Sequence, residues 1–169
     1  MTVEMKNEKY NIEKELNVWL SDAKRVVVVG IGNPLRMDDY VGVDIIRRLH
    51  GRVSNRVCLV ECETIPESYA QQILDFNPTH ILLIDAALLN LEPGESRLIE
   101  PKQMEIFPAY STHALPLRIF CEYIVETIKA KITLLLIQPQ KTDFGEGLTA
   151  KIDVSAQKIG DLILRFLPH

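Results

Sequence analysis

The chain has 169 residues, of which 47% are hydrophobic and 25% charged, a balance typical of globular proteins and not of disordered or fibrous chains. A chain of this length buries about 70% of its unfolded surface. We therefore expect one domain spanning residues 1–169, with no need of disulfides or a structural metal. The 19 Lys and Arg against 23 Asp and Glu give a net charge of -4. Without a dense basic run, this charge argues against nucleic acid as a partner.

The cysteines and the apolar runs indicate the cellular compartment in which the protein is expected. Cys58, Cys62 and Cys121 form no CxxC pair, which is typical of reduced thiols in a cytoplasm. The opening MTVEMKNEKYNIEKEL lacks the apolar region of a secretory signal. No apolar run approaches the ~20 residues that cross a bilayer. We expect a cytoplasmic protein that does not insert into membranes.

Hydrophobic periodicity predicts helices and strands in alternation. Residues 1–24 carry an appended N-terminal helix, over about 7–23, and residues 25–169 form the core. The first strand of the core (25–29, RVVVV) is an apolar run typical of a strand buried on both faces. After it we predict a helix from residue 40 to a terminator at Gly51, a strand over 56–61, a helix over 67–76 and a strand over 80–86.

The second half continues the pattern with one exception. Residues 91–100 contain a Pro-Gly turn and a short strand with no helix before it, which favours an antiparallel edge strand. A helix over 113–131, with Ser111 or Thr112 as cap, a strand over 131–137 and a helix over 149–167 follow. The whole predicts a three-layer α/β/α sandwich around a mostly parallel, twisted sheet.

In such a sheet, ligands bind beyond the carboxyl ends of the strands, so the loops that follow the strands are candidates for chemistry. Gly30 and Gly32 fit the start of a dinucleotide-binding loop, but Leu35 stands where its third glycine belongs. Pro34 also removes an amide from the phosphate cradle, and the acidic residues that follow would repel a pyrophosphate. Nucleotide binding is therefore disfavoured.

Two adjacent carboxylates, Asp38 and Asp39, follow that loop. Either could cap the helix that begins near residue 40, but two are more than a cap requires. Asp85 closes an otherwise apolar strand and needs a partner there. His113 precedes a helix, where a structural role is the commoner one.

These residues lie in loops or strand ends that the architecture gathers at one edge. Asp39, Asp85 and His113 together make a carboxylate and imidazole set of the kind that binds a divalent transition metal. Asn33, after Gly32, could tie its loop together or donate to a substrate carbonyl.

The string GIGNPLRMDDYVGVDII resembles the opening signature of the nickel-iron hydrogenase maturation proteases. The similarity continues through IPES, LLIDAALLNLEPGE, STHALPL and QPQKTDFGEGL. STHALPL is most similar to the enzymes that process the large subunit of group 4, formate-hydrogenlyase type hydrogenases. Two departures, Tyr40 after the acid pair and ECET in place of a DGGT-like loop, affect loop shape and the choice of precursor.

The resemblance implies a phosphorylase/hydrolase-like fold and an endopeptidase. It would remove a C-terminal extension from the hydrogenase large-subunit precursor once nickel has been inserted. The metal contacts would be Asp39, Asp85 and His113, and Asp38 matches an adjacent acid that is important for catalysis. Our hypothesis for the mechanism is that Asp38 serves as general base and that Asn33 or loop amides stabilise the oxyanion. The nickel would come from the substrate, although other divalent transition metals could occupy the site. We expect the protein to be a monomer.

Two other functions compete with this interpretation. A non-catalytic, nickel-dependent maturation chaperone could use the same three ligands. A peptidyl-tRNA hydrolase-like esterase also resembles a strand followed by GIGNP, but it predicts a basic cleft and a histidine where this chain has DDYVGVD.

Overall fold

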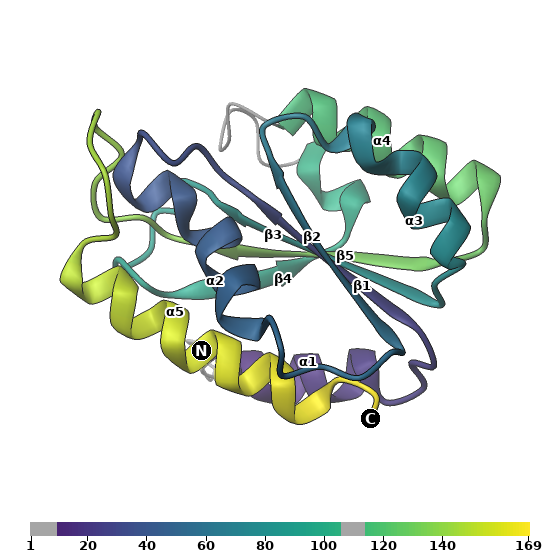
Figure 1. The fold of residues 1–169 in the computed structure, drawn as a ribbon. Coiled ribbons are helices and arrows are strands. Elements are labelled where there is room, and N and C mark those ends of the chain that lie inside the picture. The colour runs from purple at the N-terminus through teal and green to yellow at the C-terminus, as the bar shows by residue number, and fades with distance from the viewer. Residues whose placement is uncertain (1–9, 106–113) are drawn as a thin grey trace, which may run out of the picture.

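The computed structural model describes residues 10–105 and 114–169 and confirms the expected α/β architecture (Figure 1). Its five-stranded sheet has the order β2-β1-β3-β5-β4. The strands are β1 (Val26–Ile31), β2 (Val57–Glu63), β3 (His80–Ala86), β4 (Ser96–Ile99) and β5 (Lys131–Ile137). All neighbours pair in parallel except β4, which is antiparallel to β5, as the sequence predicts for an edge strand.

The described helices cover both faces of this sheet. They are α1 (Ile12–Leu20), α2 (Val41–Leu49), α3 (Ala70–Phe76), α4 (Ala114–Thr127) and α5 (Ala150–Phe166). Three short 3-10 helices are η1 (Met37–Tyr40), η2 (Pro66–Tyr69) and η3 (Pro101–Glu105). Helices α1, α2 and α5 pack on one face, and α3 and α4 on the other (Figure 1).

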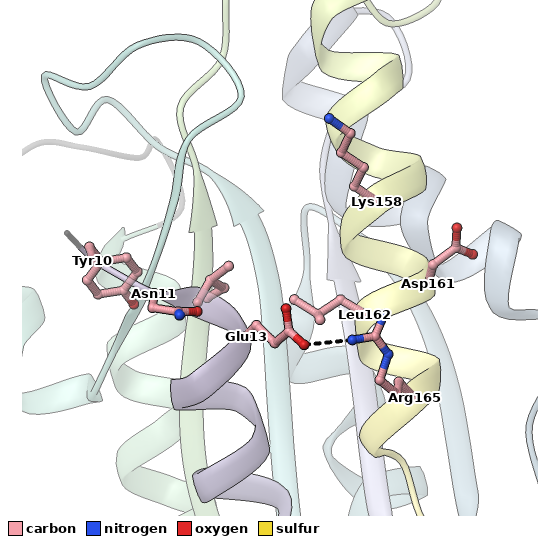
Figure 2. A pocket seen from close by; sticks show the side chains of 8 residues that line it. Tyr10, Asn11, Glu13, Lys158, Asp161, Leu162 and Arg165 are labelled. Carbon is pink, nitrogen blue, oxygen red and sulfur yellow. Dashed lines mark hydrogen bonds and ion pairs between the residues drawn. The ribbon is translucent and has the colours of Figure 1, made fainter.

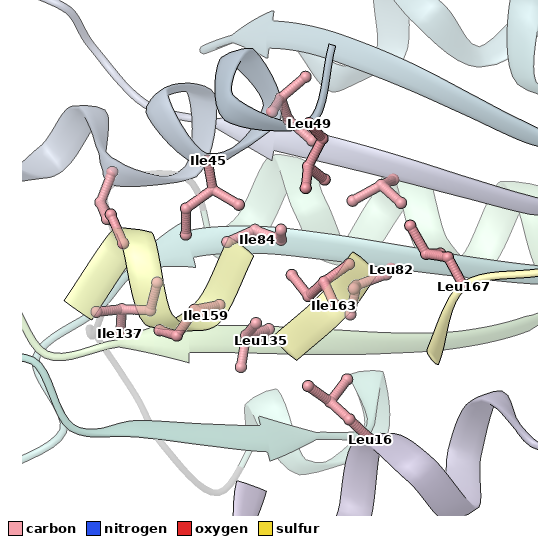
Figure 3. Packing of buried hydrophobic residues seen from close by; sticks show 14 of the residues in the cluster. Leu16, Ile45, Leu49, Leu82, Ile84, Leu135, Ile137, Ile159, Ile163 and Leu167 are labelled. Carbon is pink, nitrogen blue, oxygen red and sulfur yellow. The ribbon is translucent and has the colours of Figure 1, made fainter. Parts of the chain in front are cut away.

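The strands bury alternate side chains against the two helical layers. Leu82 and Ile84 of β3 face the layer of α1, α2 and α5, as Figure 3 shows, whereas Ile81 and Leu83 face α3 and α4. Every residue of β1 and β3 is buried, which explains why their sequences are continuous apolar runs without alternation. The polar exceptions are His80, which begins β3, and Asp85, which closes its apolar run.

The strand order creates a switch point between β1 and β3. From β1 the chain crosses to β2 on one side, and later to β3 on the other. Since β1, β2, β3 and β5 run in the same direction, their carboxyl ends meet at one edge of the sheet, which we call the carboxyl edge. Ligand sites of open α/β sheets lie at such a point.

Local structure differs from the sequence-based expectation at several boundaries. Helix α1 begins at residue 12 because the Asn11 side chain accepts a hydrogen bond from Lys14 N (3.1 Å). The prediction that Asp38 or Asp39 caps α2 is wrong: both lie in η1, Tyr40 holds the cap position, and no side chain caps this helix. The predicted caps of α4, Ser111 and Thr112, lie outside the described residues.

The first strand is longer than its apolar run. It continues through Gly30 and Ile31, which pair with Glu61 and Glu63 across a register shift in β2. This irregularity lies at the carboxyl edge, where bulges commonly redirect side chains.

Among residues 10–105 and 114–169, no helix is both long enough and apolar enough to cross a bilayer.

The start of α2 rests directly on the sheet. A Cβ at Gly42 would meet the carbonyl oxygens of Ile84 and Ile31 well inside van der Waals contact. A Cβ at Gly30 would similarly meet the Gly42 carbonyl and the Ile46 side chain. The two glycines therefore permit a close approach of α2 to the ends of β1 and β3.

Gly42→Ala should destabilise the protein by about 1–3 kcal/mol, because the added methyl group can only be placed by moving α2 away from backbone atoms. Gly160→Ala in α5 is the matched control, since a Cβ there meets nothing within 4 Å. That change should be neutral or stabilising by about 0.5–1 kcal/mol. Urea denaturation measures both, and equal stability of the two variants would contradict the close approach.

His80, at the start of β3, is only 2% exposed, with Nε2 3.1 Å from Asp22 Oδ1 and Nδ1 2.9 Å from Thr79 Oγ1. Burial lowers the pKa of His80 below its ordinary 6.5, although Asp22 opposes the shift. The unfolded chain therefore takes up a proton at a higher pH than the folded one, and the free energy of unfolding falls as pH drops below about 6.5.

We expect His80→Gln to make this decline less steep. The free energy of unfolding of both proteins, measured between pH 7.5 and 5, tests it. Identical slopes would mean that the imidazole titrates alike in the folded and unfolded chains.

Candidate functional site

Asp39 lies in η1, which crosses over the end of β1. Its backbone oxygen occupies the space that a Cβ of Gly32 would fill, so this glycine is needed for η1 to approach the strand. The Asp39 carboxylate is half-buried and accepts a hydrogen bond from Asn33 N through Oδ2 (3.0 Å). One carboxylate is thereby fixed at the carboxyl end of β1 and keeps some contact with solvent.

Asp85 lies at the end of β3, the strand next to β1. Its side chain has no exposed surface, and Oδ1 accepts a hydrogen bond from Ala86 N (2.9 Å). Alternation along β3 turns Asp85 toward the layer of α3 and α4. Gly42, in the first turn of α2, packs against the carbonyl oxygen of Ile84, which is the residue before Asp85. The chain that leads into α2 therefore lies close to Asp85. The structure thus brings Asp39 and Asp85 to adjacent strand ends.

His113, the predicted third ligand, lies outside the described residues. The described helix α4 begins at the next residue, Ala114, and runs back to the start of β5. Because β5 is parallel to β1 and β3, the first turn of α4 belongs to the carboxyl edge. Within residues 10–105 and 114–169, no three His, Cys, Asp or Glu side chains are grouped to hold a metal ion.

Asp38, next to Asp39, is placed differently. Its carboxylate is fully buried and accepts hydrogen bonds from the backbone amides of Gln140, Lys141 and Thr149 (3.0, 2.9 and 2.7 Å). The hydroxyl of Thr149 lies 3.0 and 2.9 Å from its two oxygens. The two adjacent acids therefore have different surroundings, because Asp39 is partly exposed and Asp38 is enclosed.

Asn33 ties its own loop together, which was one of the two roles expected for it. Its Oδ1 accepts a hydrogen bond from Leu35 N (2.9 Å), and its backbone N–H donates to Asp39. The side-chain Nδ2 is then the group of Asn33 suited to donate to a substrate carbonyl.

Two of the three cysteines behave as small apolar residues. Cys62 and Cys121 are 2% and 1% exposed, and burial is the main reason that the pKa of each thiol rises to about 12. The carboxylates of Asp85, Glu67 and Glu63 raise the pKa of Cys62 further. A protonated thiol is a poor nucleophile, so the site does not favour cysteine catalysis.

Three residues without the freedom of glycine, Met37, Glu63 and Asn90, adopt left-handed backbone angles in the loops at this edge. Met37, at the start of η1, has φ 45°, and Glu63, at the end of β2, has φ 49°. Such conformations cost of order 1–3 kcal/mol and are held by surrounding contacts, most often near functional sites. Here Met37 N donates to Gly145 O (3.0 Å), and Gly32 N donates to Glu63 O (2.7 Å).

A hollow of about 620 Å³ elsewhere contains none of the predicted site residues (Figure 2). It lies between the start of α1 and the second half of α5, and an ion pair between Glu13 and Arg165 (2.6 Å) crosses it. This hollow therefore belongs to the packing of the appended helix and not to the carboxyl edge.

The partners of Asp38 lie in the loop between β5 and α5 and in the first residue of the helix predicted over 149–167. The residue types of this loop do not indicate that the amides of Gln140 and Lys141 face a carboxylate. These contacts span 102, 103 and 111 residues, so local sequence patterns could not reveal them.

Comparison with known proteins points to one family. The family model described as hydrogenase maturation protease (HycI) matches residues 43–166. A protein of Methanocaldococcus jannaschii assigned to these proteases is 31% identical over 156 residues, covering 88% of this chain and 91% of the relative. The hydrogenase 3 maturation protease of Escherichia coli K12 is 26% identical over 133 residues, covering 79% and 85%.

Solved structures share the fold as well. The crystal structure of the nickel-iron hydrogenase maturation protease HycI from Thermococcus kodakarensis superposes with a TM-score of 0.83 at 35% identity. The match covers 90% of this chain and 98% of that one. The family model, the sequence relatives and the fold agree, and the chain belongs to the hydrogenase maturation proteases, a family of peptide hydrolases.

Proposed function

We propose that the protein is a cytoplasmic, monomeric endopeptidase that removes the C-terminal extension of a nickel-iron hydrogenase large-subunit precursor after nickel insertion. One observation carries the proposal: in a chain of this family, Asp39 and Asp85 lie at the carboxyl ends of adjacent strands, at the switch point of the sheet. Nickel is part of the substrate in this proposal and reports that the precursor is assembled.

Asp39, Asp85 and His113 would hold the nickel. Two carboxylates at one edge repel each other, and a divalent cation between them removes that repulsion. A mixed set of oxygen and nitrogen ligands suits a divalent transition metal and leaves coordination positions open for the precursor. His113 joins the proposed set because it directly precedes α4, whose first turn belongs to this edge.

Hydrolysis adds water across the scissile bond, with OH going to the carbonyl carbon and H to the leaving nitrogen. Bound nickel would polarise the peptide carbonyl. The protein contributes orientation: Asp39 is fixed through Asn33 N, and Asn33 Nδ2 is suited to donate to the developing oxyanion.

The geometry favours Asp39 over Asp38 for contact with the attacking water. Asp39 retains exposed surface, whereas Asp38 has none and its oxygens already accept several hydrogen bonds. A general base must reach the proton that it removes. Asp38 could remove a proton from water only after the hydrogen bonds that it accepts had been broken.

Exposed apolar side chains around the site support a protein substrate. Leu35, Ile65, Leu88 and Phe144 each lie on a different loop beyond a parallel strand, and between 47% and 85% of each is exposed. Exposed apolar side chains gathered in one region commonly mark a protein interaction surface. A folded precursor that inserts its C-terminal segment into the site would contact these four side chains, which form the exposed rim of the site.

Asp85→Asn should abolish processing, with a loss greater than the roughly 10–100-fold that removal of an outer-shell metal partner costs. Asparagine keeps the oxygen that accepts from Ala86 N, so the fold should persist. Asp44→Asn is the matched control, because Asp44 pairs with Arg48 on α2 and should leave processing unchanged. Mass spectrometry of the precursor, incubated with each variant with and without nickel, measures the cut.

The same assay separates the competing functions. Stable binding of nickel-loaded precursor without shortening would indicate the non-catalytic chaperone. Release of peptide from peptidyl-tRNA, with an uncut precursor, would indicate the esterase. Full processing by Asp85→Asn would contradict the proposed metal contact.

Phe144→Ser should weaken precursor binding by about 5-fold or more, the effect of losing an interface residue worth at least about 1 kcal/mol. Phe144 is 85% exposed, so the free energy of unfolding should change by less than about 0.5 kcal/mol. Val18→Ser, which changes an exposed residue of α1, serves as control. Equal KM values for both variants would remove Phe144 from the docking surface.

A further inference from the structure

The Asp38 carboxylate is the centre of a long-range hydrogen-bond cluster. Three backbone amides of residues 140–149 donate to it, and the Thr149 hydroxyl lies within hydrogen-bond distance of both its oxygens. Asp38 N donates in return to Lys141 O (3.1 Å). No part of Asp38 is exposed to solvent. A buried carboxylate is stable only when it is satisfied in this way.

The arrangement is not a helix cap. A cap accepts from amides of its own helix, two or three residues ahead. Asp38 instead accepts from the loop between β5 and α5, more than 100 residues away. It therefore joins two loops of the carboxyl edge.

Further contacts run along the same pair of segments. Met37 N donates to Gly145 O (3.0 Å), and Gly145 N donates to Leu35 O (2.8 Å). The Arg36 side chain donates to Thr142 O (3.2 Å). In Figure 1 the yellow-green loop before α5 stands beside the blue segment before α2.

This junction bears directly on Asp39, the next residue in η1. One side of η1 is fixed by the approach to Gly32 and by the bond from Asn33 N to Asp39. Asp38 fixes the other side. Loss of that second anchor would free η1 to rotate and would move the Asp39 carboxylate.

We propose that Asp38 is a positioning residue: its buried carboxylate locks η1 to the loop of residues 138–149 and so holds Asp39 in place to bind nickel. The proposal rests on the function proposed above, because it takes Asp39 as a nickel contact. It assigns Asp38 a role different from the general base of the hypothesis drawn from the sequence.

The Thr149 hydroxyl gives the sharpest test. Thr149→Val removes the hydroxyl that bonds Asp38, whereas Thr149→Ser keeps it, and both retain the backbone amide. Thr149→Val should bind Ni²⁺ about 10-fold more weakly than the wild type, at the lower end of the roughly 10–100-fold cost of losing an outer-shell partner. Thr149→Ser should restore wild-type affinity.

Asp38→Asn should have the larger effect, because the new NH₂ group faces backbone donors. We expect this variant to bind Ni²⁺ about 100-fold more weakly than the wild type, at the upper end of the cost of losing an outer-shell partner. The amides of Gln140, Lys141 and Thr149 should also exchange hydrogen faster. Ile163→Val, a conservative change of a buried residue in α5, controls for a general loss of stability and should leave both readouts unchanged.

Calorimetry with Ni²⁺ alone and hydrogen exchange by NMR on the full chain give these readouts. Wild-type exchange and affinity in Asp38→Asn, with a reduced kcat, would overturn the proposal and make Asp38 the base. Equal effects of Thr149→Val and Thr149→Ser would also overturn it. If the wild type neither binds Ni²⁺ nor cuts the precursor, the proposed function fails. The positioning role then fails as well, even if hydrogen exchange shows that Asp38 holds η1 to the loop of residues 138–149.

Discussion

The close approach of α2 to the sheet at Gly42 is the constraint on which the site depends. A helix normally stands off from a strand by the thickness of its side chains, but here the first turn of α2 touches the carbonyl oxygens of Ile31 and Ile84. That contact places η1 over the ends of β1 and β3. Asp39 and Asp85, 46 positions apart in the sequence numbering, consequently occupy neighbouring strand ends.

The same packing concentrates negative charge in a partly buried place. Asp85 has no exposed surface, and with Glu67 and Glu63 it contributes to the raised pKa of Cys62. Bringing carboxylates together at low solvent access costs free energy unless hydrogen bonds or a cation compensate. Asp39 and Asp85 each accept a backbone amide. A site of this kind has more to gain from a divalent cation than one exposed to water.

Features that depend on local pattern could be predicted from the sequence. The bounds of β3 and β5 follow from their apolar runs, and the position of Asp85 follows from its place at the end of one. The separate hydrogen-bond partners of Asp38 and Asp39 could not be predicted, because they depend on which way each side chain turns in η1. The 3-10 turn itself was unexpected, since a helix from residue 40 accounted for the apolar spacing. His113 lies outside the described residues, so its part in the metal set stays a prediction.

The two acids show how a short turn gives like residues unlike surroundings. Asp39 follows Asp38 directly, yet one carboxylate bonds to the loop after β1 and the other to the loop after β5. The second loop also carries Phe144, at the exposed rim of the site. If Phe144 contacts the precursor and Asp39 binds nickel, a movement of the Phe144 loop would be passed to Asp39 through the hydrogen bonds of Asp38, the residue before it. Docking and metal recognition would then be coupled by hydrogen bonds already formed in the free enzyme, with no need for a large conformational change.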